Sequence, residues 1–284
     1  MEDKNEKNLN CEKILSVVMP VYNEEATLRE IVDEVLARPE TAELILIDDG
    51  SKDSSRTIID EYVSKNPGKV KKYFQEVNMG KGSAIRKGFD LASAPVVIIQ
   101  DADKEYSPED YPVMLNPIIT NKADVVYGSR FQGGPGRVLY FWHQLGNKFL
   151  TFVSNLLTDL TFTDVETCYK AFKREVIQNI NLTTNRFGIE IEITAKIAKT
   201  KCLKIYEVPI SYHGRTYEEG KKVTWKDGIA ALWFMLKFNI LQNKKYFYKK
   251  SWNYIIKNPL INYTGDENEC AKQSWHIQAG QSST

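Results

Sequence analysis

The chain has 284 residues, of which 42% are hydrophobic and 26% are charged, and its formal net charge is +1. This length suits one large α/β domain with an appendage, and the near-neutral charge argues against the broad positive field with which proteins bind nucleic acid. The sequence contains no apolar run long enough to span a bilayer, and its first residues lack the apolar core of a secretory signal, so we expect a cytoplasmic protein.

Short apolar runs alternate with amphipathic segments through the first hundred residues. Runs rich in Val, Ile and Leu predict strands, and segments with apolar residues at helical spacing predict helices. In chain order these are strand Leu15–Met19, helix Ala26–Leu36, strand Leu44–Ile47, helix Ser54–Val63, strand Lys71–Gln75, helix Gly82–Ala92 and strand Val96–Ile99. The alternation is typical of a mostly parallel sheet flanked by helices.

The later part of the chain continues this pattern less regularly. Further strands are predicted at Val125–Gly128 and Lys204–Val208, and a further helix at Ile189–Lys199. Leu139–Leu157 is rich in aromatic and aliphatic residues but is interrupted by polar ones, which predicts an amphipathic helix. Such a helix either lies at a surface or packs against the sheet.

The segment Trp225–Leu241 has apolar residues on one side of a predicted helix. Lysines mixed with aromatic residues follow or end it, namely Lys237, Lys244, Lys245, Lys249 and Lys250. This combination suits a membrane surface, because the apolar face enters the interface while the lysines contact anionic lipid. A buried helix with a solvated basic end fits the spacing equally well.

These patterns divide the chain into four parts. We expect a polar N-terminal extension over residues 1–13, a catalytic domain over 14–224, an amphipathic and basic aromatic segment over 225–256, and a disordered polar tail over 257–284.

Two carboxylates follow the run Val96–Ile99 closely, in Asp101-Ala102-Asp103. Open α/β sheets bind their ligands at the carboxyl ends of strands. Carboxylates two residues apart in a tight turn suit a hard divalent cation that also binds phosphate oxygens. Taken alone, acidic residues after a strand are more often helix caps or parts of solvated turns.

Polar clusters also follow the first two predicted strands, at Pro20–Glu25 and at Asp48–Asp53. Parallel strands bring these clusters and Asp101–Asp103 to one edge of the sheet. Acidic side chains gathered there repel each other unless a cation or a hydrogen-bonding ligand is present. Each cluster alone fits a helix cap, whereas their convergence predicts a binding site.

The segment Asn78–Gly82 precedes a predicted helix. Its glycines permit close backbone approach, and Lys81 adds positive charge near the helix N-terminus, where phosphates bind. The segment is not a P-loop, because Gln75 stands where the first glycine of that motif would be.

Several motifs occur in order at compatible spacing: VVMPVYNEE, LIDDGSKDSS, NMGKGSAIRKG, IIQDADKEYSPED, VYGSRF and RTYEEGKK. With them the chain resembles family 2 of the glycosyltransferases over about residues 14–241, and within it the polyprenyl-phosphate glycosyltransferases of the dolichyl-phosphate mannose synthase type. The resemblance implies a GT-A fold of the nucleotide-diphospho-sugar transferase class. It also implies a nucleotide-sugar donor, Mg²⁺ or Mn²⁺, and inversion at the anomeric carbon.

The resemblance also assigns residues to the donor and the metal. Asp101 and Asp103 match the cation-binding acids, and Glu105 stands where relatives often carry a metal-binding Gln, so it either joins the ligands or caps the next helix. The expected donor-binding set is Pro20, Tyr22, Glu24, Asp49, Lys81, Gly82, Asp101, Ala102, Asp103, Arg130, Arg215 and Lys221.

Other matches concern catalysis. Arg130 matches a phosphate-binding arginine, whose forked guanidinium suits phosphate better than lysine does. Arg215 and Lys221 match a loop that closes over the donor, although Glu218-Glu219-Gly220 only approximates the motif of the synthases. Asp164 matches an acid on the acceptor side, where it acts either as a general base or as a positioning group. The expected catalytic residues are Asp101, Asp103, Asp164 and Arg215.

We therefore predict a metal-dependent inverting glycosyltransferase that moves mannose or glucose, from a donor of the GDP-mannose or UDP-glucose class, to polyprenyl phosphate. Such an enzyme is expected to be peripheral on the cytoplasmic face of the membrane, with a membrane protein as a possible partner. The alternative is transfer to a hydroxyl of a glycan, for which Asp164 would be an obligatory base. A phosphatase is disfavoured because a catalytic Lys and Thr are not evident, and a subunit that only recruits partners through Trp225–Leu241 requires an empty acidic site.

Overall fold

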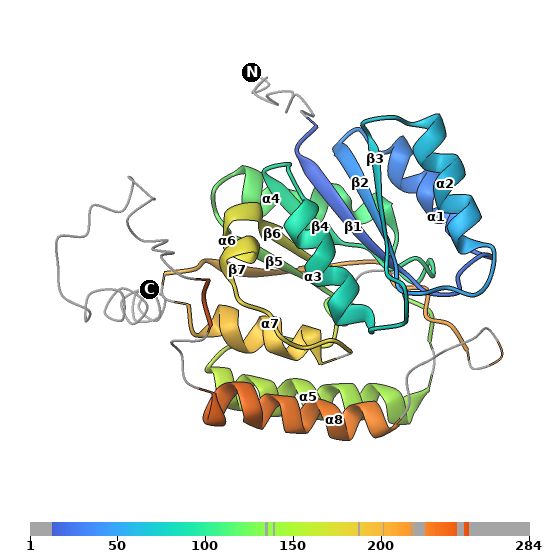
Figure 1. Ribbon diagram of the computed structural model, residues 1–284. Helices are drawn as coiled ribbons and strands as arrows, with labels where there is room; N and C mark the ends of the chain where they lie inside the picture. Colours follow the sequence, from blue (N-terminus) through green and yellow to red (C-terminus); the bar gives the residue numbers. More distant parts are fainter. Residues whose placement is uncertain are drawn as a thin grey trace, which may run out of the picture.

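The computed structural model describes residues 13–133, 136–138, 140–186, 188–200, 202–216, 218, 225–242 and 247–249 (Figure 1). In this part of the chain, seven strands form one sheet with the order β3-β2-β1-β4-β6-β5-β7. Buried apolar side chains from its strands and covering helices form one continuous core. The arrangement agrees with the predicted α/β class.

The first half of the sheet is parallel, as predicted. Its elements are β1 (Leu15–Val21), α1 (Leu28–Ala37), β2 (Thr41–Asp48), α2 (Ser55–Lys65), β3 (Val70–Phe74), α3 (Lys81–Leu91) and β4 (Val96–Ile99). Strand β1 pairs with β2 on one side and β4 on the other, and its residues are almost all buried because helices cover both faces. All seven elements of this half correspond to predicted ones, with ends shifted by a few residues.

The second half contains a strand that the sequence patterns missed. Strand β6 (Lys170–Lys173) runs antiparallel between β4 and β5 (Val125–Ser129), and β5 pairs in parallel with β7 (Ile205–Pro209). A run of four residues with a lysine at each end lacks the usual strand pattern. Lys170 is nevertheless fully buried, and its ammonium group donates to the carbonyls of Val165 and Thr167. Also unpredicted are the short helices η1 (Pro108–Asp110), α4 (Tyr111–Ile119) and α6 (Arg174–Asn179).

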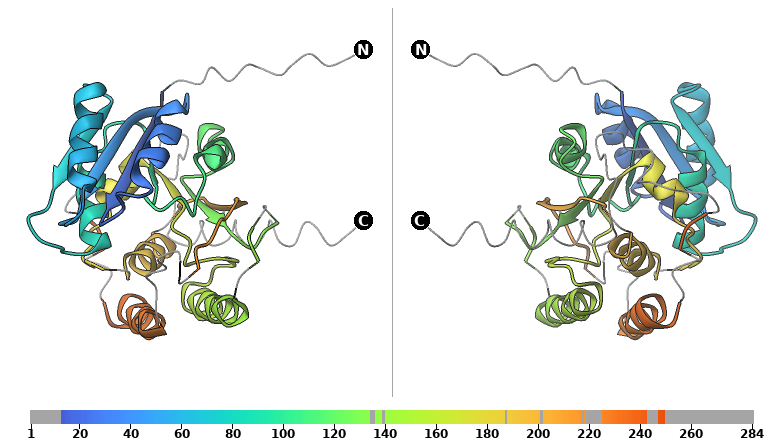
Figure 2. Two further views of the ribbon diagram at one scale, coloured as in Figure 1. Left: turned by 90° about the vertical axis from the view of Figure 1, so that its right-hand side faces the viewer. Right: turned by 90° about the vertical axis from the view of Figure 1, so that its left-hand side faces the viewer.

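Three helices form a layer beyond the sheet. Helix α7 (Ile189–Ala198) lies nearest to it, and α5 (Phe141–Thr158) and α8 (Trp225–Leu236) lie side by side beneath α7 (Figures 1 and 2). A π-helical turn, η2 (Lys237–Leu241), continues α8. A small apolar cluster, centred on Val165, Ile191, Ala231 and Met235, holds the layer together. Leu150, Val153 and Leu157 of α5 and Leu232 and Phe234 of α8 pack against this cluster.

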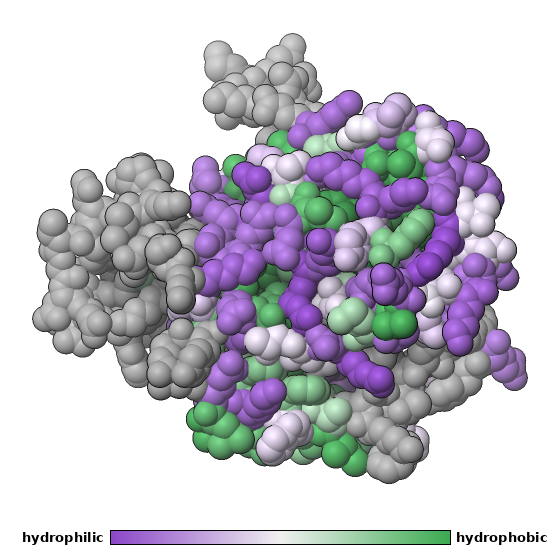
Figure 3. Space-filling model, viewed as in Figure 1, coloured by the Kyte–Doolittle hydropathy of each residue, from purple (hydrophilic) through white to green (hydrophobic). Residues whose placement is uncertain are grey.

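The outer sides of α5 and α8 carry large exposed apolar residues, which we call the α5–α8 face. Trp142 is 75% exposed and Phe152 65%, and Trp233 of α8 is 55% exposed. The other members are Phe141, Leu145, Phe149, Leu156, Ile229, Leu236, Ile240 and Leu241. Figure 3 shows apolar side chains gathered along this edge of the molecule. The expectation of a core helix at Trp225–Leu241 therefore holds only for its inner side, where Met235 and Phe238 are buried.

Several predictions fall outside the described residues. These are residues 1–12 of the N-terminal extension, the tail over 257–284, and Lys221, Lys244, Lys245 and Lys250. Lys249 is described, and its ammonium group lies 3.0 Å from Asp90 on α3. No helix among the described residues is both long and apolar enough to cross a membrane.

The close packing of α3 on β1 depends on Gly88. A Cβ atom at this position would overlap Val18 of β1, which lies in the buried core. We expect Gly88→Ala to lower the free energy of unfolding by about 1–3 kcal/mol, because the core must shift to admit the methyl group.

Gly146, in the middle of α5, provides the matched control because no atom lies within 4 Å of its Cβ position. Gly146→Ala should raise the free energy of unfolding by about 0.5–1 kcal/mol through helix propensity. Urea denaturation of the two variants measures both effects, and equal effects would contradict the packing argument.

Candidate active site

The polar segments that follow β2, β1 and β4 meet at one edge of the sheet, as predicted, because these strands are neighbours. Hydrogen bonds join the segments directly. The Asn23 N–H group donates to Ser51 Oγ at 3.0 Å, and the Thr27 hydroxyl donates to the Ala102 carbonyl at 2.8 Å. The second bond fixes the Asp101–Asp103 turn against the start of α1. Pro20 and Tyr22 belong to the same edge, at the end of β1.

Asp101 and Asp103 each contact a positively charged side chain from another part of the chain. Asp101 Oδ1 lies 2.8 Å from Lys81 Nζ, and Asp103 Oδ2 lies 2.7 Å from Arg215 Nη2. Burial raises the pKa of Asp103 to about 7, and the charges of Asp101 and Glu105 act in the same direction, against that of Arg215. The turn is therefore a place where negative charge is crowded and poorly solvated.

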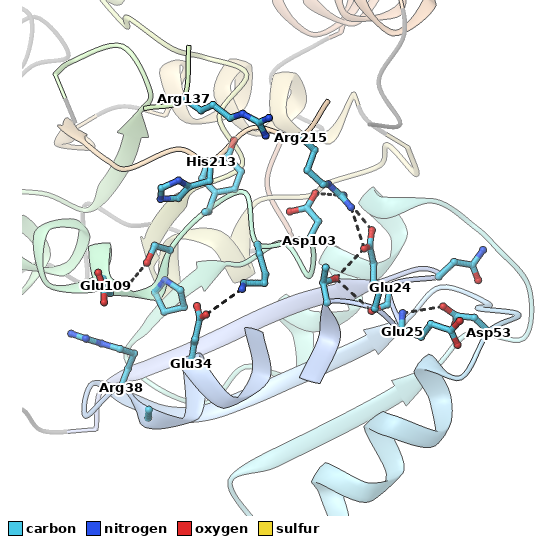
Figure 4. Close-up of a pocket in the computed structure, with 18 of the residues that line it drawn as sticks. Glu24, Glu25, Glu34, Arg38, Asp53, Asp103, Glu109, Arg137, His213 and Arg215 are labelled. Carbon is cyan, nitrogen blue, oxygen red and sulfur yellow. Dashed lines mark hydrogen bonds and ion pairs between the residues drawn. The ribbon is translucent and has the colours of Figure 1, made fainter. Parts of the chain in front are cut away.

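Glu105 lies beside this pair but faces the chain that follows β7. Its Oε1 atom accepts a hydrogen bond from the Arg215 N–H group at 2.8 Å, and its Oε2 atom accepts one from the Tyr212 hydroxyl at 3.1 Å. The Arg215 guanidinium also reaches Glu24, with nitrogen–oxygen distances of 3.4 and 3.5 Å (Figure 4). Glu105 thus holds the backbone from which Arg215 extends into the acidic cluster.

Asp49 fixes the loop that leads into α3. Its two carboxylate oxygens accept hydrogen bonds from the Met79 N–H group at 2.7 Å and the Gly80 N–H group at 2.9 Å. Gly80 has a φ of +100°, a conformation that residues with a side chain rarely adopt. Asp49 lies at the predicted edge of the sheet, and its carboxylate is hydrogen-bonded to this loop.

The N-terminus of α3 is arranged differently from what its glycines suggested. We expected Lys81 and Gly82 to present the helix N-terminus to a phosphate. Instead the segment 184–186 lies across it: the Ser83 N–H group donates to the Asn185 carbonyl at 3.1 Å, and a Cβ on Gly82 would overlap the Thr184 carbonyl. Gly82 admits this segment, while the Lys81 side chain reaches the acidic cluster.

Arg130 and Asp164 form a buried ion pair. The guanidinium donates to both carboxylate oxygens, from Nε at 2.6 Å and from Nη2 at 2.8 Å, and the Arg130 backbone N–H group adds a bond at 3.1 Å. Asn147 of α5 donates a further bond at 3.3 Å. Burial alone would raise the pKa of Asp164, but the charge and hydrogen bonds of Arg130 outweigh it and lower this pKa below its ordinary value.

A second group of buried polar residues adjoins Asp101, and sequence reasoning missed it. Glu190 lies 3.4 Å from Lys81, and Cys168, a free buried thiol, lies 3.1 Å from the same ammonium group. Burial, and then the charge of Glu190, raises the pKa of Glu166 to about 7. For Glu166 and Cys168 the only sequence signal was their place in Asp164–Lys170, a polar segment without regular periodicity, and Glu190 lies in the helix predicted at Ile189–Lys199.

A cleft of about 1270 Å³ opens beside the acidic cluster. Its walls include Glu24, Asp103 and Arg215, together with Arg137 and His213, as Figure 4 shows. Arg137 and His213 were not predicted. His213 lies just after β7, so the rule that ligands bind where strands end would have pointed to it.

The carboxylates of this site fit a magnesium or manganese ion that is also coordinated by a bound ligand. Among the described residues, no group of three His, Cys, Asp or Glu side chains is arranged to hold a metal by itself. Mg²⁺ is usually bound by one or two carboxylates, with phosphate oxygens and water completing its coordination. Asp101 and Asp103, crowded at a strand end, supply two such carboxylates.

Comparison with known proteins identifies the family. Residues 16–180, more than half of the chain, match the family model described as glycosyl transferase family 2. The chain belongs to this family. It is 31% identical over 218 residues to a dolichol-phosphate mannosyltransferase of Pyrococcus furiosus, covering 73% of this chain and 58% of that protein.

A second relative is the dolichyl-phosphate beta-glucosyltransferase of Trichomonas vaginalis, which is 32% identical over 219 residues, covering 70% of this chain and 65% of that protein. The chain thus spans less than two thirds of either relative. Among solved structures, the glucosyl-3-phosphoglycerate synthase of Mycobacterium tuberculosis in complex with Mg²⁺ and uridine diphosphate has a TM-score of 0.61 at 21% identity, covering 80% of this chain and 79% of that one. This similarity confirms the predicted GT-A-like fold.

The Arg130–Asp164 pair predicts a specific effect on stability. Removing one partner of a buried pair leaves the other charge unpaired, so Asp164→Ala should lower the free energy of unfolding by about 3–5 kcal/mol. The double variant Arg130→Met/Asp164→Leu should be less destabilised, because neither charge remains. Denaturant titration measures the free energy of unfolding of both variants. If the double variant loses as much stability as the two single substitutions together, the pairing argument is contradicted.

The same pair predicts a pH dependence. The pKa of Asp164 is lower in the folded than in the unfolded protein, so its contribution to stability is present above about pH 4 and is lost as the pH falls through the folded value. Between pH 5 and pH 3, wild type should therefore lose more stability than Asp164→Asn. Thermal unfolding across this range checks the difference, and parallel curves would contradict it.

Proposed function

We propose that the protein transfers a hexose from a nucleotide-sugar donor to a polyprenyl phosphate, with inversion at the anomeric carbon. The names of the two curated relatives share a dolichyl phosphate acceptor and differ in the sugar. They therefore support the acceptor class more strongly than they support a particular sugar. Mannose from GDP-mannose and glucose from UDP-glucose are the donors to test first.

The observation that carries the acceptor assignment is the state of Asp164. Its carboxylate is fully buried, accepts bonds from Arg130 and Asn147, and has a lowered pKa. A group held this way is a weak proton acceptor near neutral pH. A phosphate acceptor is already ionised and needs no base, whereas a hydroxyl acceptor does. Asp164 is better suited to orienting Arg130, the expected phosphate-binding arginine.

In the proposed reaction, an oxygen of the acceptor phosphate forms a bond to the anomeric carbon while the bond from that carbon to the donor diphosphate breaks. No proton is transferred. We assign Lys81 and Arg215, which contact the acidic cluster, to stabilising the charge that develops on the leaving diphosphate, and Lys221 is assigned the same role from the sequence. A bound Mg²⁺ or Mn²⁺, held by Asp101 and Asp103 with Glu105 nearby, would neutralise part of that charge.

The α5–α8 face supports a membrane location for this reaction. A polyprenyl chain resides in a bilayer, so an enzyme that uses it must reach the interface. Two adjacent helices with exposed Trp142, Phe152 and Trp233 resemble amphipathic helices that lie in the plane of a membrane. We therefore propose peripheral attachment to the cytoplasmic face of the membrane through this surface.

One observation favours a second candidate, transfer to a hydroxyl. The pKa of Glu166 is raised to about 7, which suits a general base near neutral pH. In that case Glu166 would replace Asp164 in the role expected from the sequence. Glu166→Gln would then abolish transfer, whereas transfer to a phosphate should tolerate it.

The metal assignment predicts the effect of Asp103→Asn. The substitution removes one charge at a strand end without opening a cavity, so the protein should fold normally and lose transfer by about 100-fold or more. The assay follows radiolabelled sugar from each donor into detergent-solubilised polyprenyl phosphate, with and without chelator. Asp60→Asn, on the exposed side of α2, serves as the control.

Two results would contradict the proposed reaction. One is near-normal transfer by Asp103→Asn with unchanged dependence on metal. The other is labelled product that remains in the aqueous phase with a soluble acceptor while none forms with polyprenyl phosphate.

The membrane assignment predicts weaker vesicle binding when the α5–α8 face is made polar. Burying a large apolar side chain contributes about 1.5–3 kcal/mol, so Trp142→Ser combined with Phe152→Ser should reduce affinity for vesicles at least about tenfold. Ile119→Ser, which changes an exposed residue at the end of α4, should have little effect. Co-sedimentation measures both. Unchanged binding by the double variant would contradict the membrane assignment of this face.

A further inference from the structure

The acids of the candidate metal site are already neutralised by side chains of the chain itself. Lys81 Nζ lies 2.8 Å from Asp101 Oδ1 and 3.4 Å from Glu190. Arg215 Nη2 lies 2.7 Å from Asp103 Oδ2 and 3.4 Å from Glu24. Each acid of the D-x-D turn therefore has its own cationic partner.

These contacts compete with a divalent cation for the same carboxylates. A carboxylate oxygen that accepts a hydrogen bond keeps a second lone pair, but a cation bound to Asp103 or Asp101 would lie close to the positive charge of Arg215 or Lys81. Placing a divalent ion there without moving either side chain brings like charges together in a poorly solvated site. Binding of the ion is therefore opposed until at least one of the two side chains moves away.

Arg215 is suited to such a displacement. Its backbone is fixed by the bond from its N–H group to Glu105, so the guanidinium can change partners while its anchor stays in place. Its Nε atom is buried and has no hydrogen-bond partner among the described residues, which leaves a donor free for a ligand. A forked guanidinium pairs with phosphate oxygens as readily as with a carboxylate.

We propose, building on the proposed function, that Arg215 and Lys81 hold Asp103 and Asp101 in place of the divalent cation until the donor diphosphate draws them away. The ion pairs between side chains are then exchanged for two others: the carboxylates bind the cation, and the guanidinium and ammonium groups bind the diphosphate. The charges balance, since each released group gains a partner of the opposite sign. Arg215 is in this sense a positioning residue for the metal ligands as well as a group that contacts the donor.

The exchange couples the two ligands thermodynamically. The cation alone must displace Arg215 or Lys81 into water, whereas with a nucleoside diphosphate present the displaced groups gain new partners. The cation should therefore bind weakly alone and much more tightly with the nucleotide. The cation must in turn strengthen the binding of the nucleotide by the same factor. Substituting Arg215 by a neutral residue removes the competitor and part of this coupling.

The test measures binding of Mn²⁺ to the full chain by electron paramagnetic resonance of the free ion, alone and with UDP or GDP. Arg215→Gln should bind Mn²⁺ alone about tenfold more tightly than wild type, and the strengthening by nucleotide should fall by about the same factor. Lys81→Gln should act in the same direction through Asp101. Arg215→Lys keeps the charge and should bind Mn²⁺ alone about as weakly as wild type.

Lys104→Gln is the matched control for removing a positive charge. Lys104 follows Asp103 in the chain but pairs with Glu30 and Glu34. Its loss therefore changes the local electrostatic field without freeing Asp101 or Asp103. It should change Mn²⁺ affinity by less than about threefold, the size expected of a screened surface charge. A tenfold effect in this control would mean that the field alone explains the Arg215 result, and would overturn the exchange.

The remaining outcomes separate this inference from the proposed function. Equal Mn²⁺ affinity of wild type and Arg215→Gln, or weaker binding by the variant, overturns the exchange even if sugar transfer still requires metal. Absence of Mn²⁺ binding to wild type with both nucleotides overturns the exchange together with the metal dependence of the reaction. If Arg215→Gln does not fold, as judged by circular dichroism, Lys81→Gln decides, and unchanged Mn²⁺ binding by that variant overturns the proposal.

Discussion

Carboxylates gathered at the ends of β1, β2 and β4 repel one another, and the surrounding structure supplies the charge that keeps them together. Parallel pairing of these strands leaves no alternative position for Glu24, Asp49 and Asp101. Backbone N–H groups donate hydrogen bonds to Asp49, and cationic side chains from other elements pair with Asp101 and Asp103. The chain that follows β3 and the chain that follows β7 thus bring cationic residues to this edge.

The same constraint extends to the neighbouring wall of the site. Arg130, at the end of β5, and Asp164 satisfy each other in a buried pair, whereas Glu166 retains a buried oxygen without a partner among the described residues. Asp164 and Glu166, two residues apart, therefore have pKa values that are shifted in opposite directions. Burial acts on both, but only Asp164 is hydrogen-bonded to a guanidinium, and the charge of Glu190 raises the pKa of Glu166 further.

The parallel half of the fold could be predicted because its signals are local. Apolar runs of strand length alternate with amphipathic helices, and polar residues mark the strand ends, so the convergence of the acids followed from topology alone. Strand β6 could not be predicted, because the burial of Lys170 depends on how the irregular segment before the strand places the carbonyls of Val165 and Thr167 at its ammonium group, and no periodicity marks that conformation. The coverage of the α3 N-terminus by residues 184–186 was hidden for a similar reason: a glycine that admits a phosphate and one that admits another backbone look the same in sequence. Helical periodicity likewise predicted α5 and α8 but could not tell which side of each helix would remain exposed.

The reversed direction of β6 has a consequence for how the site is assembled. The amino end of an antiparallel strand lies at the edge where parallel strands have their carboxyl ends, so the residues just before β6, Asp164 to Cys168, arrive beside Asp101. One wall of the site therefore comes from loops of the β1–β4 half, and the facing wall comes from the chain inserted between β5 and β6 and from the chain after β7, which carries His213 and Arg215. The two walls are joined through the pairing of β4 with β6. Within the inserted chain, which includes α5, Cys168 contacts Lys81, so a change in the packing of that chain reaches the cation that holds Asp101.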